Sequence, residues 1–329
     1  MYSMNQFGND LYTGKKSVPF IRRRRLWFFI AIGLILASIL VLLIRPPQFS
    51  IEFTGGSQFT VSGLEQPDQR VASDAVHTVV PDATTKVTTV GTDAVRVQTD
   101  QMTEVETREV AQALASAFDV DVAEVTTSFI GPSWGADVTR QSLWGIGIFL
   151  ALTFLILAIY FRTWKMSAAA IIGLVDVLIV TVGVYALCGF EISPAAVIGF
   201  LTILGYSLYD TTVVFDKIRE TTSEDGLKSG RTFAESVELG VNQTLIRSIN
   251  TSVIAVLPVA AILFIGAFWL GADTLSDISL SITVGIIVAA YSTLFVAAPL
   301  YASFREREPE LRKRDARLLE LRELATADV

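Results

Sequence analysis

The chain has 329 residues, of which 51% are hydrophobic and 18% are charged, and its net charge is −7 at neutral pH. The apolar residues fall in long blocks, which excludes an ordinary soluble or disordered protein and predicts a polytopic α-helical membrane protein. Acidic and basic residues gather in different segments, so the net charge is a poor guide to partners, and no nucleic-acid surface is implied. The single cysteine excludes an intrachain disulfide and a metal site built from thiolates.

Six apolar stretches are long enough for transmembrane helices, which need about 20 residues to cross about 30 Å of hydrocarbon. They are residues 26–44, 143–160, 168–188, 192–215, 245–270 and 278–301. We therefore divide the chain into a cytoplasmic N-terminal segment (1–25), transmembrane helix 1 (26–45), an extracytoplasmic domain (46–140), transmembrane helices 2 to 6 (141–304) and a basic cytoplasmic tail (305–329).

The first apolar stretch follows four arginines at residues 22–25, as a signal peptide would. Its core is longer than the apolar core of a usual signal peptide. Arg45, Pro46 and Pro47 also stand where a small-residue cleavage site would be expected. We therefore expect an uncleaved anchor.

The segment 46–140 is predicted to form a small α+β domain. Residues 49–53 and 58–61 alternate apolar and polar side chains around Gly55-Gly56, which is typical of a β-hairpin. A helix (67–80), two strands (85–90 and 94–99, turning through residues 91–93), a helix that starts at a Thr103 and Glu106 capping box, and a strand (121–128) follow. The predicted order is ββαββαβ, a ferredoxin-like arrangement with two helices on one face of an antiparallel sheet.

The sequence contains no catalytic triad with credible spacing, no metal-ligand cluster and no phosphate-binding glycine loop, and its only histidine is His77. We therefore expect no enzyme activity, no cofactor and no metal. The hairpin residues Phe53, Gly55, Gly56 and Phe59 are instead predicted to contact a substrate polypeptide or a partner, because an exposed edge strand can pair with an extended chain.

The basic residues predict the orientation in the membrane. They gather before the first stretch, between the second and third, between the fourth and fifth, and after the sixth. By the positive-inside rule, both termini are cytoplasmic and the protein lies in the cytoplasmic membrane. The basic tail (residues 305–322) suits contact with anionic membrane lipids, and contact with the translocon or with ribosomes stays open as an alternative.

Asp210 interrupts the fourth apolar stretch, where an ionised carboxylate costs roughly 3 kcal/mol or more. It shares one helical face with Gly199, Ile203 and Tyr206, because these residues recur at spacings of four, three and four. Small residues on the same side would permit close approach of a neighbouring helix, namely Gly199, Thr202 and Gly205. We therefore expect Asp210 to face packed protein.

Asp176, in the third stretch, is predicted to lie at a depth comparable to that of Asp210 in the antiparallel fourth stretch. Arg247 and Thr251 are one turn apart in the fifth. A guanidinium favours an ionised carboxylate whereas desolvation favours the neutral form, so Asp210 with Arg247 has the chemistry of a proton gate. Two alternatives stay open: an ion pair that only fixes helix register, and an Asp176 that only meets cytoplasmic water.

The stretch from Gly205 to Glu220 resembles the fourth-helix signature of the SecF branch of the SecD/SecF family of protein-export membrane proteins. Phe53-Thr54-Gly55-Gly56 is similar to the family's Phe-x-Gly-Gly turn, and residues 242–252 resemble its fifth helix. The resemblance covers residues 20–304. Two positions depart from the family pattern, since Tyr209 replaces an Asn and Val175 stands where a His is often found.

The resemblance implies a six-helix member of the resistance-nodulation-division superfamily that pairs with SecD into a twelve-helix unit. Such a unit uses the proton-motive force to help draw a translocating polypeptide out of the SecYEG channel. By the same resemblance, Asp210 and Arg247 take the proton-coupling positions, with Thr251 one turn on, and Asp176 is a second candidate acid.

Two other functions remain open. A proton-coupled exporter of small molecules or lipids would use the same kind of intramembrane acid, but such exporters generally carry two large external domains and twelve helices in one chain. A purely structural translocon subunit would keep the fold without needing an ionisable residue in the fourth helix. Replacing Asp210 by asparagine separates these possibilities.

Overall fold

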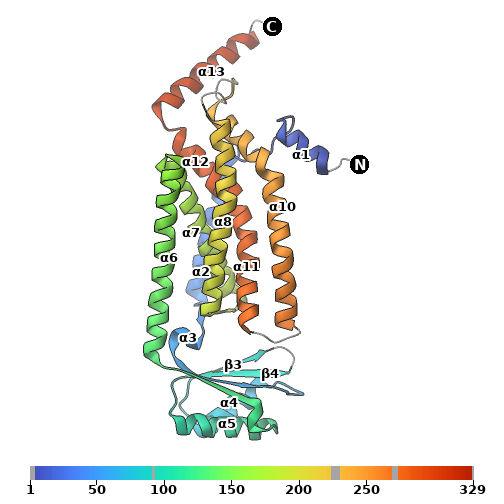
Figure 1. Cartoon of the computed structure of the whole chain (residues 1–329), viewed down its shortest axis with the longest axis vertical. Helices are drawn as coiled ribbons and strands as arrows, with labels where there is room; N and C mark the ends of the chain where they lie inside the picture. The colour runs from blue at the N-terminus through green and yellow to red at the C-terminus, as the bar shows by residue number, and fades with distance from the viewer. Residues whose placement is uncertain (1–3, 91–92, 224–229, 269–272, 328–329) are drawn as a thin grey trace.

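The computed structural model describes residues 4–90, 93–223, 230–268 and 273–327. Long helices form a bundle, a small sheet with two helices lies at one end of it, and both chain termini lie at the other end (Figure 1). Parts of three predicted features fall outside the described residues: the turn at residues 91–93, the basic segment between the fourth and fifth stretches (residues 224–229), and the end of the fifth stretch at Leu270.

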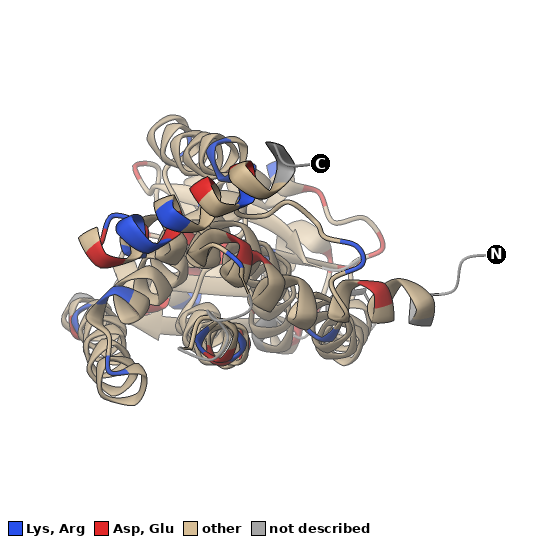
Figure 2. Cartoon of the chain, turned by 90° about the horizontal axis from the view of Figure 1, so that it is seen from above, with Lys and Arg blue, Asp and Glu red and all other residues tan. Residues whose placement is uncertain are grey.

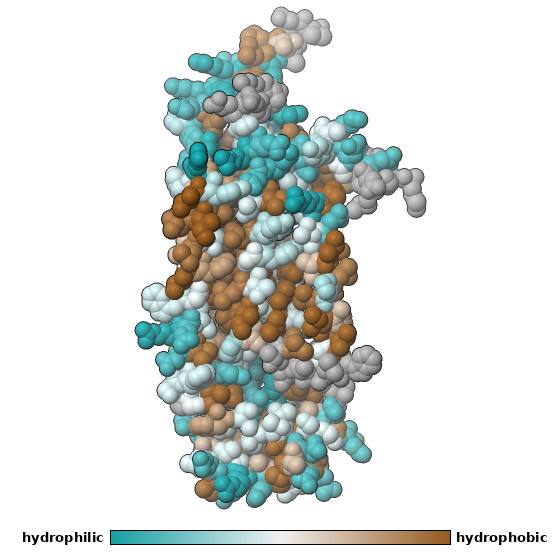
Figure 3. Space-filling model, viewed as in Figure 1, coloured by the Kyte–Doolittle hydropathy of each residue, from teal (hydrophilic) through white to brown (hydrophobic). Residues whose placement is uncertain are grey.

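In the described part of the chain, six helical spans are long and apolar enough to cross a membrane, which confirms the six predicted stretches. On the face shown in Figure 3, a brown apolar belt lies between two more hydrophilic ends. Helices suit this belt because their backbone polar groups are satisfied internally. The spans are α2 (Arg24–Ile44), α6 (Pro132–Phe161), α7 (Trp164–Cys188), α8 (Pro194–Thr221), α10 (Phe233–Phe268) and a sixth made of α11 (Asp273–Ser292), the π-helical η2 (Thr293–Ala297) and α12 (Ala298–Arg305).

Helix α10 is longer than the membrane requires. Its 36 residues span about 54 Å at about 1.5 Å per residue, against about 30 Å of hydrocarbon. The first turns of α10 therefore extend beyond the apolar belt, where two terminal helices of the chain lie (Figure 1). These are α1 (Met4–Tyr12) and α13 (Pro309–Ala327), and α13 carries charges of both signs along its length (Figure 2).

The sheet domain, which we define as residues 56–130, contains four antiparallel strands in the order β3-β4-β2-β5. Its elements are β2 (Gly56–Val61), α4 (Gln69–Val79), β3 (Thr85–Val90), β4 (Ala94–Thr99), α5 (Glu104–Phe118), the 3-10 turn η1 (Val122–Glu124) and β5 (Val125–Ile130). The predicted capping box is present at the start of α5. Buried residues of both helices pack with the inner faces of β2 and β4, including Val76, Leu114, Phe59 and Val97.

The first predicted hairpin is wrong, so the sheet domain has the order βαββαβ. Only Gln48–Phe49 is extended (β1), and it pairs in parallel with β6 (Glu191–Ile192), the connection between α7 and α8. Ile51–Thr54 forms a single helical turn, α3. The last strand also begins later than predicted, because the Asp121 carboxylate accepts from the Ala123 amide and caps η1.

Gly55 and Gly56 make the change of direction from α3 into β2. Both have positive φ, 74° and 133°, which side-chain-bearing residues rarely adopt. A Cβ on Gly56 would also lie 2.3 Å from the Thr99 carbonyl oxygen on β4. The glycine pair is therefore required by the backbone path of the chain.

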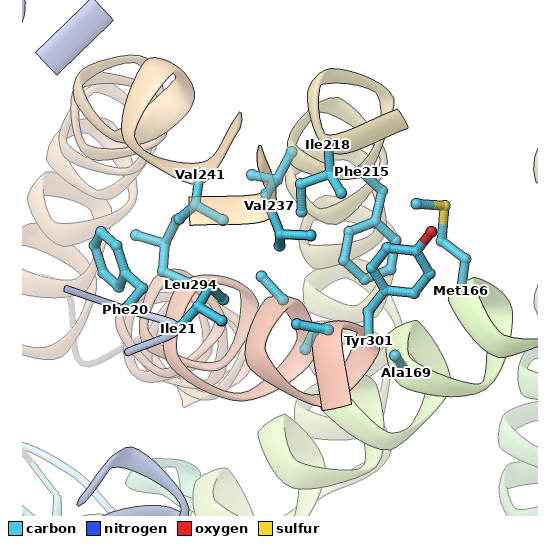
Figure 4. Packing of buried hydrophobic residues seen from close by; sticks show 14 of the residues in the cluster. Phe20, Ile21, Met166, Ala169, Phe215, Ile218, Val237, Val241, Leu294 and Tyr301 are labelled. Atoms are coloured by element: carbon cyan, nitrogen blue, oxygen red, sulfur yellow. The ribbon is translucent and has the colours of Figure 1, made fainter. Parts of the chain in front are cut away.

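The end of the bundle that holds the termini has its own apolar core. Phe215 and Ile218 of α8 pack with Val237 and Val241 of α10 and with Tyr301 of α12 (Figure 4). Phe20 and Ile21, just before α2, join the same cluster. This core fixes α8 against α10 beside the candidate site.

Candidate functional site

Asp210 is buried between α8 and α10, with 5% of its surface exposed. Ser248 of α10 donates a hydrogen bond from Oγ to Asp210 Oδ1 over 2.7 Å. The second carboxylate oxygen, Oδ2, is buried and has no hydrogen-bond partner within the described part of the chain. An ionised oxygen left in this condition is costly, whereas a proton on Oδ2 would remove its charge.

Arg247 does not form the predicted ion pair in this structure. Among the described residues, no nitrogen of Arg247 lies within 4.0 Å of an Asp210 oxygen, although its charge still acts on that carboxylate. Successive residues on a helix point about 100° apart, so placing Ser248 against Asp210 turns Arg247 to the exposed side. Thr251 donates to the Arg247 carbonyl oxygen of its own helix over 2.7 Å.

Sequence reasoning missed Ser248, although its pattern was visible. Thr244, Ser248 and Ser252 recur every four residues along α10, and all three are buried. Side chains at this spacing share one helical face. The buried polar stripe of α10 is therefore the face next to the one that carries Arg247.

Asp176 of α7 is buried, with 2% of its surface exposed, and neither of its carboxylate oxygens has a hydrogen-bond partner in the described chain. Ser292 of α11 lies next to it, and the charge of Asp176 acts on Tyr291 of the same helix. Ser292 gives its hydroxyl hydrogen to the Gly173 carbonyl oxygen over 3.0 Å, one turn before Asp176. The buried Tyr291 hydroxyl has no protein partner among described residues.

The helices that carry the two acids meet the same short piece of the sixth span. Thr211, next to Asp210 in the chain, has its hydroxyl 3.0 Å from that of Thr293. Thr293 begins η2 directly after Ser292, which contacts α7. The helices that carry the two acids thus both contact a π-helical segment, a feature frequent at functional sites.

Helices α8 and α11 also approach each other closely, about two to three turns of α8 before Thr211. A Cβ on Gly199 would lie 1.7 Å from Ser281 Oγ, and one on Gly285 would lie 2.0 Å from Ile203 Cδ1. The predicted small face is correct only at Gly199, because Thr202 and Gly205 are exposed on the outer side of α8. The two departures from the family pattern also lie outside: Tyr209 is 56% exposed and Val175 is 36% exposed.

The predicted contact residues of the first hairpin are mostly internal. Phe59 is fully buried in the core of the sheet domain, and Gly56 is buried against β4. A contact role for Phe59 is incompatible with this burial. Phe53 lines an apolar groove of about 380 Å³ between α2, α6, α7 and α8, and Gly55 is half-buried.

In the described residues no three metal-binding side chains come together. His77 lies against its own helix and loop, with Nδ1 2.8 Å from the Ser73 carbonyl oxygen and Nε2 3.2 Å from that of Ala83.

Two family models match the chain. Residues 109–307 match the C-terminal model of the protein-export membrane proteins SecD and SecF, and residues 40–62 match the SecD/SecF GG motif. The first match spans α5 to α12 and includes both buried acids. The chain belongs to the SecD/SecF family.

The chain aligns with relatives in this family over most of its length. It is 39% identical to protein translocase subunit SecF of Streptomyces coelicolor over 97% of this chain and 85% of that protein. It is 37% identical to the SecF subunit of Mycobacterium tuberculosis, covering 97% and 74% of the two chains.

Solved structures of SecDF have the same fold. The crystal structure of SecDF from Thermus thermophilus, described as a translocon-associated membrane protein, has a TM-score of 0.75 and 27% identity. SecDF in a super-membrane-facing form has a TM-score of 0.63 and 26% identity. Both matches cover 89% of this SecD/SecF family member but 39% of the SecDF chain, so this chain corresponds to less than half of SecDF.

Proposed function

We propose that this protein is a SecF-type accessory subunit of the Sec translocon that pairs with SecD and couples proton entry to the export of polypeptides. Its relatives are named protein translocase subunits, and SecDF contains a counterpart of this chain within a longer one. The SecYEG channel and a translocating polypeptide are the expected partners. Both termini face the cytoplasm, and the ferredoxin-like sheet domain faces the outside.

The observation that carries the proton-coupling proposal is the environment of Asp210. One carboxylate oxygen accepts from Ser248 and the other has no described partner. A protonated carboxyl group has one O–H donor and keeps an acceptor oxygen, whereas an ionised one only accepts. The geometry therefore suits Asp210 with a proton on Oδ2.

Release of that proton requires a new partner for the ionised carboxylate. Arg247 is adjacent to Ser248 and differs from it by about 100° around α10. In the proposed cycle, a rotation or sideways shift of α10 replaces the Ser248 hydroxyl by the Arg247 guanidinium, which favours ionised Asp210. Thr251 travels with Arg247 on the same helix, and Asp176 is a second acid on the proton route.

The energy available is sufficient for such a switch. One elementary charge crossing a potential of 100 mV releases about 2.3 kcal/mol, which changes a conformational equilibrium by roughly fiftyfold. No nucleotide is needed at this subunit. Repeated protonation and release would move α8 against α10 and, through α8, the sheet domain.

The test replaces Asp210 by asparagine in cells that depend on this chain for export. The proposal predicts slow export of a signal-peptide-bearing reporter and loss of its dependence on the proton gradient. Asp216→Asn is the matched control, since Asp216 lies on the same helix and accepts from the Tyr160 hydroxyl near the helix end. Export by Asp210→Asn at the unmodified rate, with unchanged dependence on the gradient, would leave only a structural role.

The orientation has a separate test that uses the single cysteine. Cys188 is exposed at the end of α7 nearest the sheet domain (Figure 1). A membrane-impermeant maleimide added to spheroplasts should label Cys188. In a Cys188→Ser background, a cysteine at Leu321 of α13 should react only after the membrane is opened. The reverse pattern would place the termini outside.

A further inference from the structure

Glu191 lies between the sheet domain and the bundle, at the connection from α7 to α8. Its Oε1 is 2.5 Å from Nζ of Lys86 on β3, and its Oε2 accepts from Nε2 of Gln98 on β4 over 3.0 Å. Nη1 of Arg96, also on β4, lies 4.0 Å from Oε2. One carboxylate of the bundle thus holds two strands of the sheet domain.

The backbone around Glu191 makes a second connection. Glu191 and Ile192 form β6, which pairs with β1, and the Ser50 amide donates to the Ile192 carbonyl oxygen over 3.1 Å. The chain then continues from Ser50 through α3 into β2 of the sheet domain. Side-chain and backbone contacts therefore meet at the same short connection.

The same connection begins the helix that carries Asp210. Ser193 accepts from the Ala196 amide and caps α8, and its hydroxyl donates to Asp277 of α11 over 2.6 Å. Helix α8 then runs unbroken from Pro194 past Asp210, a distance of about 24 Å at about 1.5 Å per residue. An unbroken helix therefore links Asp210 to the connection that carries Glu191.

Acidic and basic side chains lie close to one another at this junction. Lys86 and Arg96 of the sheet domain face Glu191, and Arg96 also acts on Asp277, as does Glu52 of α3. The side chain of Glu191 is only 14% exposed, so its partners are not readily replaced by water. Removing one member of such a pair leaves a half-buried charge without its counterion.

We propose that Glu191 is a positioning residue that, through Lys86 and Gln98, makes the orientation of the sheet domain follow α8. This inference rests on the proposed function for its use in export, because a domain that must move with α8 needs a connection at this place. The connection itself is a structural property that exists with or without proton coupling.

The experiment measures the distance between bundle and sheet domain by electron paramagnetic resonance on the full chain in lipid nanodiscs. One nitroxide label is attached to the native Cys188 and the other to Ser116→Cys on the exposed side of α5. We expect one narrow distance distribution with Glu191 intact. Glu191→Gln should broaden it or add a second distance, because the glutamine amide keeps a hydrogen bond but not the charge.

Two further variants make the result specific. Exchanging the two charges, as Lys86→Glu with Glu191→Lys, should restore the narrow distribution and the export rate that either single change lowers. Glu220→Gln is the matched control, since it breaks the Lys217–Glu220 ion pair at the other end of α8. The control should leave both distance and export unchanged.

The outcomes separate this inference from the proposed function. An unchanged distribution in Glu191→Gln overturns the positioning role, whatever Asp210→Asn does to export. Broadening that the charge exchange does not reverse also overturns it, because the Lys86–Glu191 pair would then not be what fixes the orientation. A broad distribution reversed by the exchange upholds the inference even where Asp210→Asn leaves proton dependence intact.

Discussion

Ser248 and Asp210 form a 2.7 Å hydrogen bond across the buried contact between α10 and α8. The bond joins the two helices at the point where the fourth span carries its acid, and it occupies only one of the two carboxylate oxygens. The face of α10 that carries Ser248 thus meets Asp210, and Arg247 lies one position away on the exposed side.

Replacing Ser248 by alanine is expected to impair export while the protein still folds. The change removes the only described donor to Asp210, and leaving a buried polar group without its partner costs about 1–3 kcal/mol. Ser236→Ala is the control, because this buried serine of α10 donates only to the Thr232 carbonyl oxygen. Reporter export and thermal unfolding in detergent are measured for both. Equal export by the two variants would argue against a role for the Ser248 contact.

The effects on stability of replacing Thr211 and of replacing Thr293 are predicted to be strongly coupled, because the two hydroxyl groups contact each other. Changing either residue to valine leaves the other hydroxyl unpaired in the bundle and should lower the free energy of unfolding by about 1–3 kcal/mol. The double variant removes both hydroxyl groups and should be destabilised no more than either single variant. Denaturant unfolding in detergent checks this; additive losses would mean that the two hydroxyl groups act independently.

Gly199 is expected to tolerate no larger side chain. Alanine at this position would drive its Cβ into Ser281 of α11, and overpacking of this kind costs about 1–3 kcal/mol. Gly205→Ala is the control on the same helix, because a Cβ there meets no atom within 4 Å. The midpoint temperature of thermal unfolding should fall for Gly199→Ala and should stay level or rise for Gly205→Ala. Equal unfolding temperatures would show that α8 and α11 separate easily.

Asn242 is predicted to hold the N-terminal segment on α10. Its side chain is buried, accepts from the Val18 amide over 2.7 Å and donates to the Val18 carbonyl oxygen over 3.1 Å. Asn242→Ala should therefore speed hydrogen exchange of the amides in residues 17–23. Asn250→Ala, at an exposed position on α10, should not. Slow exchange in both variants would mean that Glu238, which accepts from the amides of Ile21 and Arg22, is sufficient.

Hydropathy predicted the six spans because a chain in hydrocarbon must satisfy its backbone hydrogen bonds internally. Hydropathy underestimated the length of α10, because its apolar run begins at Leu245 whereas the helix begins at Phe233. The extra turns are held by contacts from distant segments: Asn242 binds the N-terminal segment, and Asp315 of α13 accepts from the Phe233 amide. Contacts between distant segments leave no periodic signal in the sequence.

The burial of Asp210 against protein was predictable from the cost of a carboxylate in the membrane and from the helical face it shares. Its hydrogen-bond partner was not predictable. The choice between Ser248 and Arg247 depends on how far α10 is rotated against α8, and packing sets that rotation. The prediction of the first hairpin was wrong for a related reason. Five alternating residues fit both a strand and a short helical turn, and the pairing of β1 with β6 decides the outcome.

Protons are proposed to enter through Asp210, and a measurement of proton flux tests this most directly. The full chain is reconstituted with its SecD partner in liposomes that hold a pH-sensitive dye, and a potassium gradient imposes the membrane potential. We expect proton uptake by the unmodified protein and by Asp216→Asn, and background uptake by Asp210→Asn. Uptake by Asp210→Asn at the unmodified rate would contradict proton coupling at Asp210 and leave Ser248 and Asp210 as a structural contact.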